Sequence, residues 1–394
     1  MKAVILAAGE GLRLRPLTVT RPKVMLAIAN KPILQYVVES LVSAGIRDLV
    51  VVVGYKKEKI MSYFEDGKKF NARIEYVEQE KQLGTAHALA QASSYVKDRF
   101  LVVAGDNIIE PETITPLIKS KPPSVLITKS AQPSKYGVVI LEKDKLKDII
   151  EKPEQKVSEL ISTGAYVFST DIFKSIRASN SRDITFTLQY LLQENVNISC
   201  VRTDALWRDA VYPWDLLRIN SEILARESKT GLSGTVEKNV VIKGNVTIGK
   251  GSVIRSGCYI VGPTTIGAEC ELGPNVCILP GTSIGDNVTI EPFSEIKNSI
   301  IRSDVRIGSF SKISNSVLGE GVILGSHFVN DAGRSYVQLS DGFHDVEDIG
   351  VIVGDDTVIG NSVSIEAGKL IGVNCKLGTK KIIATNIPDK TIAI

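Results

Sequence analysis

Residues 1–23 read MKAVILAAGEGLRLRPLTVTRPK, and they set the interpretation of the first half of the chain. The apolar run at residues 4–6 predicts a short buried strand. After it, Gly9 and Gly11 let the backbone turn tightly and approach a ligand closely. Four cations stand nearby in the sequence: Arg13, Arg15, Arg21 and Lys23. Because successive backbone N–H groups in such a loop form a concave donor surface for anions, the stretch predicts a cradle for a triphosphate.

A glycine-rich loop after a strand also begins dinucleotide-binding domains, so that alternative needs a test. The third glycine of G-x-G-x-x-G is missing, because Leu14 occupies its position. Pro16 and Pro22 break the stretch where that fold continues as a helix. The stretch also lacks G-x-x-x-x-G-K-[ST], which excludes a P-loop.

Taken together, LAAGEGLRLRPLT and the following RPKVMLAIANKPIL resemble the signature of the sugar-1-phosphate nucleotidylyltransferases. The resemblance implies a Rossmann-like α/β nucleotide-diphospho-sugar transferase domain whose first loop holds the triphosphate. It also implies that Arg13 and Lys23 are catalytic and neutralise the phosphates at the reacting centre. The implied nucleotide-binding residues of this stretch are Leu6, Ala8, Gly9 and Gly11. A solvated basic turn is the alternative.

Length and composition limit the possible partners. With 394 residues the chain exceeds what one hydrophobic core serves, so we expect two domains. Its net charge is only +3, which gives no global attraction for nucleic acid or an anionic membrane. No apolar run reaches the roughly 18 residues of a membrane span, and no signal-peptide pattern opens the chain, so we expect a cytoplasmic protein. The five cysteines show no zinc-binding spacing and are expected to be buried apolar side chains.

Strand-like and helix-like patterns then alternate, as in an α/β domain with a largely parallel sheet. We expect helices at residues 33–42 and 57–64, and strands at 48–53 and 73–77. Ligands of such sheets bind outside the carboxyl ends of the strands. The remaining motifs are therefore sought at that edge.

The segment EQEKQLGTAH at residues 78–87 precedes a helix that we expect at 85–95. A helix start next to an amide side chain offers polar groups to the edge of a base. Its QxxxxGTA spacing resembles the base-reading segment of the family, which implies that Gln79 and Gly84 read a pyrimidine and that Thr85 lies near the base or ribose. In the alternative, Thr85 only caps its helix. His87 is expected to pack rather than to react.

Two aspartates are predicted to bind Mg²⁺. Asp106 follows the strand in FLVVAGDN, and a carboxylate at the end of a strand suits Mg²⁺, which prefers one or two carboxylates with phosphate oxygens and water. Asp209 in WRDAVYP resembles the W-x-D segment of the family. Either aspartate alone is more typical of a turn, whereas the two aspartates together indicate a metal site.

Three stretches between these aspartates resemble the family's sugar-binding segments: KYGVV, IIEKPE and STGAYVF. The resemblance implies that Gly137 approaches the sugar through its backbone, that Glu151 accepts from sugar hydroxyls and that Lys152 pairs with the sugar phosphate. Ser162 stands where many relatives have Asn, which leaves the orientation of the 2-substituent of the sugar open.

A helix expected at residues 212–228 leads to the run GLSG at 231–234, so we place the domains at 1–230 and 231–394. Beyond it an aliphatic residue recurs every six positions. The repeat positions include Ile242, Ile248, Ile254, Ile260, Ile266, Leu272, Ile278, Ile284, Ile290 and Ile296, then Ile301, Ile307, Ile313, Leu318 and Leu324, and finally Val353, Ile359, Ile365, Ile371 and Leu377. Hexapeptide repetition predicts a parallel β-helix and resembles the left-handed form, whose members typically form trimers. Residues 327–347 interrupt the repeat, and we expect a functional or interface loop there.

The two halves together resemble the archaeal bifunctional nucleotidylyltransferase and acetyltransferase type. The implied reaction joins glucose-1-phosphate or N-acetylglucosamine-1-phosphate to UTP or dTTP and releases pyrophosphate. The rivals are a non-catalytic regulatory subunit and a β-helix that also acetylates an amino sugar phosphate. We expect little or no acetyl transfer, because Ser309 and Lys312 stand where those relatives carry a histidine and a tyrosine. Asn330 does match a family asparagine, and His327 is the remaining candidate base.

Overall fold

The structure is a computed structural model that describes residues 1–155, 157–226 and 230–393. It divides into two compact units. The first comprises Met1–Glu10, Pro22–Met25 and Pro32–Asp209, and the second comprises Gly11–Arg21, Leu26–Lys31 and Ala210–Ile394. This division differs from the boundary predicted at residue 230, because two short N-terminal segments and the chain from Ala210 pack with the repeat. The predicted helix end at residue 228 lies outside the described residues.

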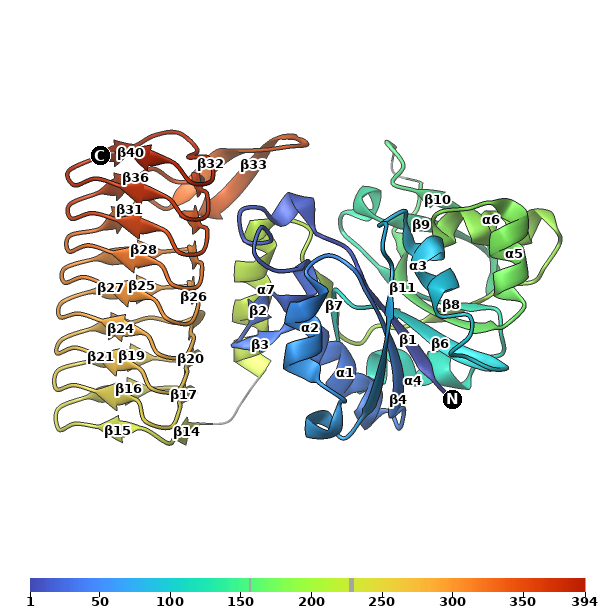
Figure 1. Cartoon of the computed structure of the whole chain (residues 1–394), viewed down its shortest axis with the longest axis horizontal. Coiled ribbons are helices and arrows are strands. Elements are labelled where there is room, and N and C mark those ends of the chain that lie inside the picture. The colour runs from blue at the N-terminus through green and yellow to red at the C-terminus, as the bar shows by residue number, and fades with distance from the viewer. Residues whose placement is uncertain (156, 227–229, 394) are drawn as a thin grey trace. The chain divides into compact units, whose positions relative to one another are not determined.

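The first unit is built on one nine-stranded sheet with the order β5-β4-β1-β6-β11-β8-β12-β10-β9 (Figure 1). Its strands are β1 Ala3–Ala7, β4 Asp48–Val53, β5 Arg73–Glu78, β6 Arg99–Ala104, β8 Ser124–Lys129, β9 Gly137–Glu142, β10 Lys145–Glu151, β11 Leu160–Ser169 and β12 Ser199–Arg202. Strands β5, β4, β1 and β6 run parallel, whereas β11 is antiparallel to β6 and β8. A two-stranded sheet pairs β7 Asn107–Ile109 with β13 Trp207–Asp209.

Helices cover both faces of this sheet. The helices of the first unit are α1 Ile33–Ser43, α2 Lys57–Phe64, α3 Thr85–Gln91, α4 Pro111–Lys119, α5 Ile172–Ser179 and α6 Ile184–Gln193. Alternate residues of β1 enter two hydrophobic cores, Ile5 with α1, α2 and α4, and Val4 with α3, α5 and α6. The expected α/β class is therefore confirmed. The predicted helix at 85–95 is too long, because α3 ends at Gln91 and turns follow, where Ser93 and Ser94 are residues of low helix propensity.

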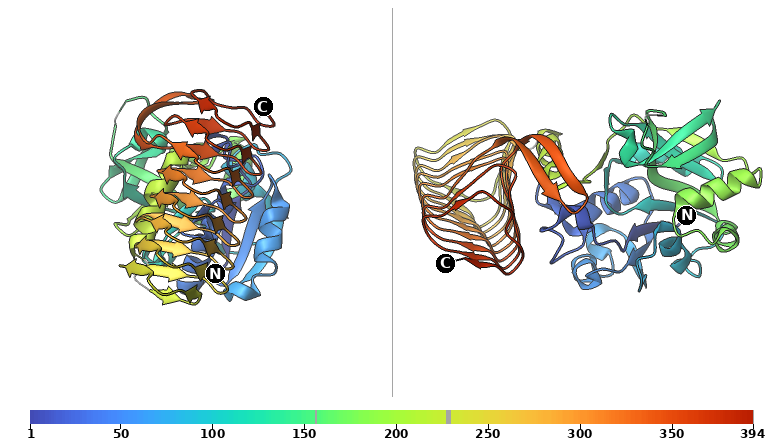
Figure 2. Two further views of the ribbon diagram at one scale, coloured as in Figure 1. Left: turned by 90° about the vertical axis from the view of Figure 1, so that its left-hand side faces the viewer. Right: turned by 90° about the horizontal axis from the view of Figure 1, so that it is seen from above.

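The second unit contains a parallel β-helix of three stacked sheets (Figure 2). The first sheet holds β14 Gly231–Leu232, β17 Val246–Ile248, β20 Thr264–Ile266, β23 Thr282–Ile284, β26 Ile300–Ile301, β29 Val317–Leu318, β34 Ile352–Val353 and β37 Leu370–Ile371. The second holds β15 Thr235–Val236, β18 Val253–Ile254, β21 Glu271–Leu272, β24 Thr289–Ile290, β27 Arg306–Ile307, β30 Ile323–Leu324, β35 Val358–Ile359, β38 Lys376–Leu377 and β40 Ile392–Ala393. The third holds β16 Val241–Lys243, β19 Tyr259–Val261, β22 Cys277–Ile278, β25 Glu295–Lys297, β28 Lys312–Ser314, β31 Val329–Asn330, β36 Ser364–Ile365 and β39 Ile382–Ile383.

The hexapeptide positions fill the axis of the β-helix. Ile248, Ile266 and Ile284 pair in register on successive coils, and the other aliphatic repeat positions join the same buried cluster. No single coil buries its aliphatic side chains alone, so stability comes from stacking. The prediction of a hexapeptide β-helix is confirmed, and the arrangement is consistent with the left-handed form.

The outer surface of the first of these sheets is covered within the second unit. Its outward side chains Ser283, Ile300 and Val317 are buried. Helix α7 (Pro213–Arg226) contributes Asn220, whose Nδ2 donates to the Gly281 carbonyl at 2.9 Å and whose Oδ1 accepts from Ser283 Oγ at 2.9 Å. From the segment Leu26–Lys31, which includes β2 Ala27–Ile28, Asn30 Nδ2 donates to the Ile284 carbonyl at 2.6 Å. Strand β3 is Lys31–Pro32.

The predicted loop at 327–347 is wrong in its start and in its conformation. His327 stays on a coil, and β31 follows it directly. The insertion is an antiparallel hairpin of β32 Gly333–Leu339 and β33 Gly342–Ile349, after which β34 resumes the repeat. The last pair of the hairpin is Leu339 with Gly342, so Ser340 and Asp341 form a two-residue loop between the strands.

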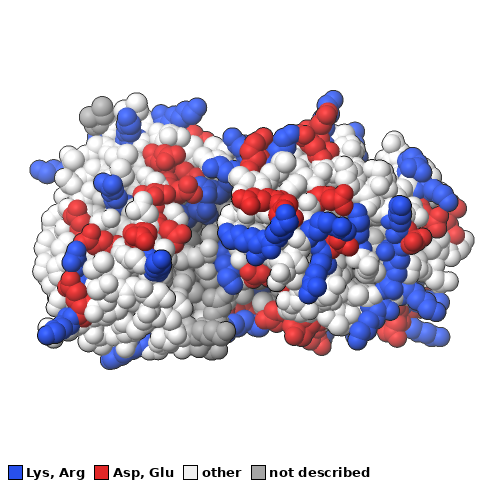
Figure 3. Space-filling view, turned by 60° about the horizontal axis from the view of Figure 1, so that its bottom comes forward, with Lys and Arg blue, Asp and Glu red and all other residues white. Residues whose placement is uncertain are grey.

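Cysteines and charges agree with the sequence analysis in part. Cys258, Cys270 and Cys375 are buried, whereas Cys200 and Cys277 are half-buried. Basic and acidic side chains are interspersed on the face shown in Figure 3, as the small net charge implies. Among the described helices, none is long and apolar enough to cross a membrane.

Candidate functional site

The candidate site of the first unit lies at the carboxyl ends of its parallel strands, where ligands of open α/β sheets bind. β1 leads into Ala8 and Gly9, β5 into Gln79 and β6 into Asp106. The carbonyl of Leu6 accepts from Gly105 N at 2.9 Å, and that of Ala8 accepts from Tyr55 N at 3.1 Å. A Cβ atom at Gly9 would meet no atom within 4 Å among those described. Hydrogen bonds to two backbone carbonyls therefore fix this part of the loop, and there is free space beside Gly9.

Lys23, Asp106 and Asp209 form one ionic cluster. Lys23 Nζ lies 2.7 Å from Asp106 Oδ2 and 2.6 Å from Asp209 Oδ1. Asp209 reaches Asp106 because β13 pairs with β7, which sets Asp209 opposite Asn107. Three residues far apart in the sequence therefore meet around one ammonium group.

Burial and charge act against each other in this cluster. Burial alone would lower the pKa of Lys23, but the charges of Asp106 and Asp209 outweigh it and raise the pKa. Burial would likewise raise the pKa of Asp106, but Lys23 lowers it. The lysine is therefore cationic and Asp106 is ionised at neutral pH.

The oxygen donors of this cluster fit a divalent cation. Asn107 Oδ1 is buried and has no hydrogen-bond partner within the described part of the chain. An unpaired amide oxygen beside two carboxylates is a hard-oxygen set of the kind that Mg²⁺ prefers. No group of three or more His, Cys, Asp or Glu residues suited to a metal occurs in the described ranges, so phosphate oxygens and water would complete the coordination. The sequence analysis missed Asn107, although it follows Asp106 directly.

The predicted base-reading residues lie together at the start of α3. Gln79 is buried, and its Nε2 donates to the Gly84 carbonyl at 3.1 Å and lies 2.9 Å from His87 Nδ1. Both amide protons of Gln79 are engaged, which leaves Oε1 as the acceptor. Gly84 has φ of 121°, and a Cβ atom there would lie 2.5 Å from the Arg182 carbonyl. Only glycine fits this position.

Thr85 does not cap its own helix, because Gly84 occupies that position and makes no side-chain bond. Thr85 N donates to Asp183 Oδ1 at 2.9 Å, and Thr85 Oγ1 accepts from Ile184 N at 2.9 Å. The alternative of a simple cap is therefore wrong. Thr85 joins the start of α3 to the start of α6, and Asp183 is a second residue that the sequence analysis did not find.

The predicted sugar-binding residues lie on neighbouring strands. Gly137 opens β9 opposite Glu151 at the end of β10. A Cβ atom at position 137 would lie 3.3 Å from Glu151 Oε2, which also accepts from Thr185 Oγ1 at 2.9 Å. Lys152 Nζ lies 3.3 Å from Glu151 Oε1. The carboxylate is thus fixed by a threonine that no sequence motif indicated.

Ser162 lies on β11, which also pairs with β9. It is buried, and its Oγ lies 3.0 Å from Tyr166 Oη. Burial raises the pKa of Tyr166 to about 12, so the phenol stays protonated at neutral pH. This pair provides two hydroxyl groups at this position of the sheet.

Arg13 and Gly11 belong to the segment Gly11–Arg21 of the second unit. Gly11 has φ of 81°, and its carbonyl accepts from Thr18 Oγ1 at 3.0 Å. Arg13 Nε lies 2.9 Å from Asp341 Oδ2 in the turn of the hairpin. An acidic partner for Arg13 was not predicted.

The candidate acetyl-transfer residues occupy the third sheet of the β-helix and its corners. His327 is exposed, and its ring stacks on Phe310 with 5.2 Å between centroids. Asn330 is buried, and its Nδ2 donates to the Ser314 carbonyl at 2.9 Å. Ser309 Oγ donates to Glu291 Oε2 at 2.8 Å. In the described chain no carboxylate contacts the ring of His327, so nothing there holds it as a base.

Comparison with known proteins places this geometry in a family. The profile described as nucleotidyl transferase matches residues 2–226, which is more than half of the chain. The chain belongs to the nucleotidyl transferase family. A second profile, described as the GMPPB C-terminal domain, matches residues 260–393 of this nucleotidyl transferase.

Relatives cover both parts of this nucleotidyl transferase. It is 34% identical to the bifunctional protein GlmU of Methanocaldococcus jannaschii, over 99% of this chain and 97% of that protein. It is also 34% identical to the glucose-1-phosphate thymidylyltransferase of Streptomyces antibioticus, over 77% of this chain and 88% of that protein. A crystal structure from Bacillus anthracis, described as a glucose-1-phosphate thymidylyltransferase, is 29% identical with a TM-score of 0.54 and covers 59% of this chain and 97% of that one. The family predicted from the first loop is confirmed.

Proposed function

We propose that this nucleotidyl transferase joins a sugar 1-phosphate to UTP or dTTP and releases pyrophosphate. One observation carries the proposal: Lys23 is held between the carboxylates of Asp106 and Asp209, at 2.7 and 2.6 Å, where a strand of the sheet ends. A fixed cation with two carboxylates suits phosphoryl chemistry, because catalysis of that chemistry is positioning and charge neutralisation.

The attacking group needs no general base. The second pKa of a phosphate monoester is about 6, so the sugar phosphate is already ionised at neutral pH. Its oxygen attacks the α-phosphorus of the nucleotide, and the bond to pyrophosphate breaks. Asp106 and Asp209, with Asn107 as a further oxygen donor, would hold Mg²⁺, which supplies positive charge to the phosphate oxygens when bound. Lys23 adds a cation fixed by its two carboxylate contacts, and Arg13 adds a second toward the triphosphate.

Gln79 supports the choice of a pyrimidine with an N–H at its Watson–Crick edge. Both protons of its amide are engaged by Gly84 and His87, so Oε1 is the atom of this side chain that is left to accept from a base. Uracil and thymine offer the N3 proton to such an acceptor, whereas cytosine has an unprotonated N3. UTP and dTTP are therefore the proposed nucleotides.

The sugar is held by the neighbouring strands. Glu151, fixed through Thr185, accepts from sugar hydroxyls, and Gly137 leaves room beside that carboxylate. Lys152 pairs with the sugar phosphate, and Ser162 contacts the 2-substituent. Glucose-1-phosphate and N-acetylglucosamine-1-phosphate are the two proposed acceptors.

A pyrophosphate-release assay over UTP, dTTP, CTP and ATP with both sugar phosphates tests the proposal. We expect turnover with UTP or dTTP only, and a loss of about 10²-fold or more in kcat for Asp106→Asn. Lys174→Met is the matched control, because its ion pair with Asp171 at 2.9 Å is exposed. Equal rates in wild type and Asp106→Asn contradict the assigned site.

We also propose that the chain forms trimers or a multiple of three through the β-helix. Its first sheet is covered by α7 and by the segment Leu26–Lys31. The other two sheets expose apolar side chains: Ile323 and Val358 on the second, and Val241, Tyr259, Val329 and Ile382 on the third. Flat apolar faces of this kind favour closed cyclic association.

A further inference from the structure

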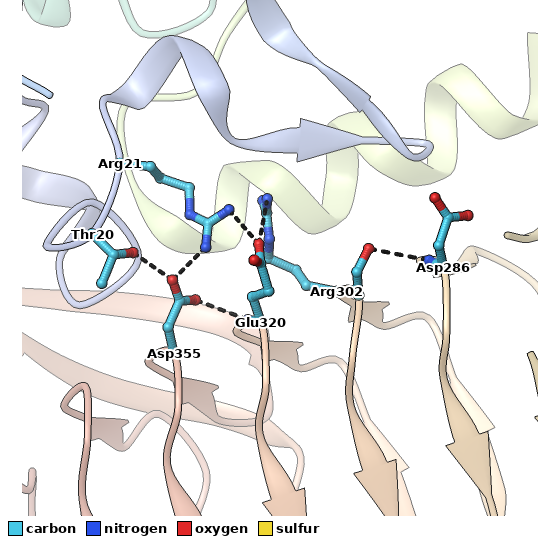
Figure 4. A network of polar contacts seen from close by, with 7 residues as sticks. Thr20, Arg21, Asp286, Arg302, Glu320 and Asp355 are labelled. Atoms are coloured by element: carbon cyan, nitrogen blue, oxygen red, sulfur yellow. Dashed lines mark hydrogen bonds and ion pairs between the residues drawn. The ribbon is translucent and has the colours of Figure 1, made fainter. Parts of the chain in front are cut away.

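The segment Gly11–Arg21, which carries the predicted catalytic Arg13, is fixed at its end by acids of the β-helix. Arg21 Nη1 donates to Glu320 Oε2 at 2.8 Å, and Arg21 Nη2 donates to Asp355 (Figure 4). Thr20 Oγ1 donates to the same Asp355 carboxylate. Asp355 is buried and is itself oriented, because its Oδ1 accepts from Glu320 N at 2.8 Å. These contacts hold the end of the segment against two coils of the β-helix.

A second contact reaches Arg13 itself. Arg13 Nε forms an ion pair with Asp341 Oδ2 at 2.9 Å, and the guanidinium lies 5.8 Å from the centre of the Tyr212 ring. The Asp341 carboxylate is held in turn by His344 Nε2 at 2.9 Å and by Tyr212 Oη at 3.4 Å. Tyr212 stacks on Trp214 with 4.8 Å between centroids. The acid that touches Arg13 is therefore fixed from two sides.

Asp341 contacts the Nε atom of Arg13, and this determines which donors of the guanidinium remain for a ligand. A guanidinium has five N–H donors, one on Nε and four on the two Nη groups. Asp341 engages Nε, and within the described residues no acceptor bonds to either Nη of Arg13. The outer edge of the guanidinium is left for the oxygens of an anion, and paired contacts on that edge are the strong mode of phosphate recognition. The side chain is 42% exposed, so a ligand has access to it.

We propose that Asp341 is a positioning residue for nucleotidyl transfer, and that it acts by orienting Arg13 toward the triphosphate. Arginine loses rotamer entropy when its side chain becomes ordered. An ion pair on Nε removes part of that cost before the nucleotide binds. The proposal rests on the role proposed above for Arg13. It gives the hairpin insertion of the β-helix a function in the transferase reaction.

Steady-state pyrophosphate release by the full chain, with UTP or dTTP and each sugar phosphate, tests this. We expect Asp341→Ala to lower kcat/KM for the nucleotide by about 10-fold, the size of effect typical when a residue that orients an active-site group is removed. We expect Asp341→Glu to recover part of the loss and KM for the sugar phosphate to stay within about twofold of wild type. Asp345→Ala is the matched control, because this acid of the same hairpin pairs with exposed Arg334 and not with Arg13. It should change kcat/KM by less than about twofold.

A double-mutant cycle separates positioning from a structural role. If Asp341 acts through Arg13, Asp341→Ala causes no further loss in an Arg13→Ala background. An additive loss, a wild-type rate for Asp341→Ala, or a faster rate because the acid competes with the triphosphate would each overturn the proposal. A drop in melting temperature of Asp341→Ala that accounts for the lost activity would also overturn it.

The same cycle distinguishes failure of the inference from failure of the proposed function. Wild-type activity of Arg13→Ala contradicts the role proposed for Arg13 in nucleotidyl transfer. A slow Arg13→Ala variant beside a fully active Asp341→Ala variant contradicts only the role of Asp341.

Discussion

Replacing Lys23 by methionine removes a cation that the structure places between Asp106 and Asp209. Each contact, at 2.7 and 2.6 Å, is worth about 6 kcal/mol at an effective dielectric constant of about 20, before the cost of desolvation is subtracted. The lysine and Asp209 side chains are only 12% and 14% exposed, so solvent screens their contact little. The Asp106 side chain is 35% exposed, so solvent screens its contact with Lys23 more and that contact contributes less. Removing one partner of such a buried group typically costs about 3–5 kcal/mol. We therefore expect Lys23→Met to lower the melting temperature by about 10 °C.

The stability that Lys23→Met loses should depend on pH in a defined direction. In wild type Lys23 lowers the pKa of Asp106, so this contribution to stability is fully present above about pH 4. In the variant two carboxylates face each other, and the pKa of one of them rises above its value in the unfolded chain. The folded variant then holds a proton that the unfolded chain lacks, so its stability falls as pH rises. The difference in melting temperature between variant and wild type should therefore increase from about pH 5 to about pH 8.

Calorimetry of the full chain at about pH 5 and about pH 8 measures this difference in melting temperature. Lys174→Met is the control for the loss of one exposed charge. Addition of about 10 mM MgCl₂ should raise the melting temperature of Lys23→Met more than that of wild type, because the two carboxylates then lack their own cation. If Lys23→Met has the same melting temperature as wild type at about pH 8 in the absence of Mg²⁺, the ionic cluster is refuted.

Three further predictions concern the second unit. Arg302→Met should raise the free energy of unfolding by about 1–3 kcal/mol in denaturant melts, because burial and the charge of Arg21 lower the pKa of Arg302 to about 10, so the folded state disfavours its charge. The ion pair of Arg302 with Glu320 is long, at 4.0 Å, and Glu320 keeps its contact with Arg21 at 2.8 Å. A decrease in the free energy of unfolding contradicts this prediction. Incubation with acetyl-CoA and glucosamine-1-phosphate should release little or no free thiol, and release at the rate of nucleotidyl transfer that is lost in His327→Ala would show an acetyltransferase. Light scattering of the full chain should report three subunits or a multiple of three, and a monomer rules out the proposed assembly.

The β-helix could be predicted because the sequence pattern that specifies each of its coils is local. Each hexapeptide places one aliphatic residue on the axis, so Ile248, Ile266 and Ile284 reveal the fold by spacing alone. The hairpin could also have been found, since its strands alternate and Asp341–Gly342 is a turn signal. The sequence analysis instead took the interruption of the repeat as a loop.

The site was accessible to sequence reasoning only where one motif contains the residue. Asp106 and Gln79 follow strands directly, so their place at the carboxyl edge follows from the order of elements. Two contacts of the candidate site join segments that share no motif. They are the hydrogen bond from Thr185 to Glu151 and the ion pair of Arg13 with Asp341. Such contacts depend on how α6 and the hairpin pack, and no local pattern of charge or hydrophobicity encodes that.

The anchoring of Arg21 by Asp355 also affects the order of events during synthesis. These partners are 334 residues apart, and at about 5–20 residues per second the ribosome needs roughly 20–70 s to make the chain between them. During that time the first sheet can form, while the segment Gly11–Arg21 still lacks the acids that hold it. A nascent chain can therefore form the sheet around β1 before Asp355 exists to hold Arg21, so the segment Gly11–Arg21 gains its final contacts only after most of the β-helix has been made.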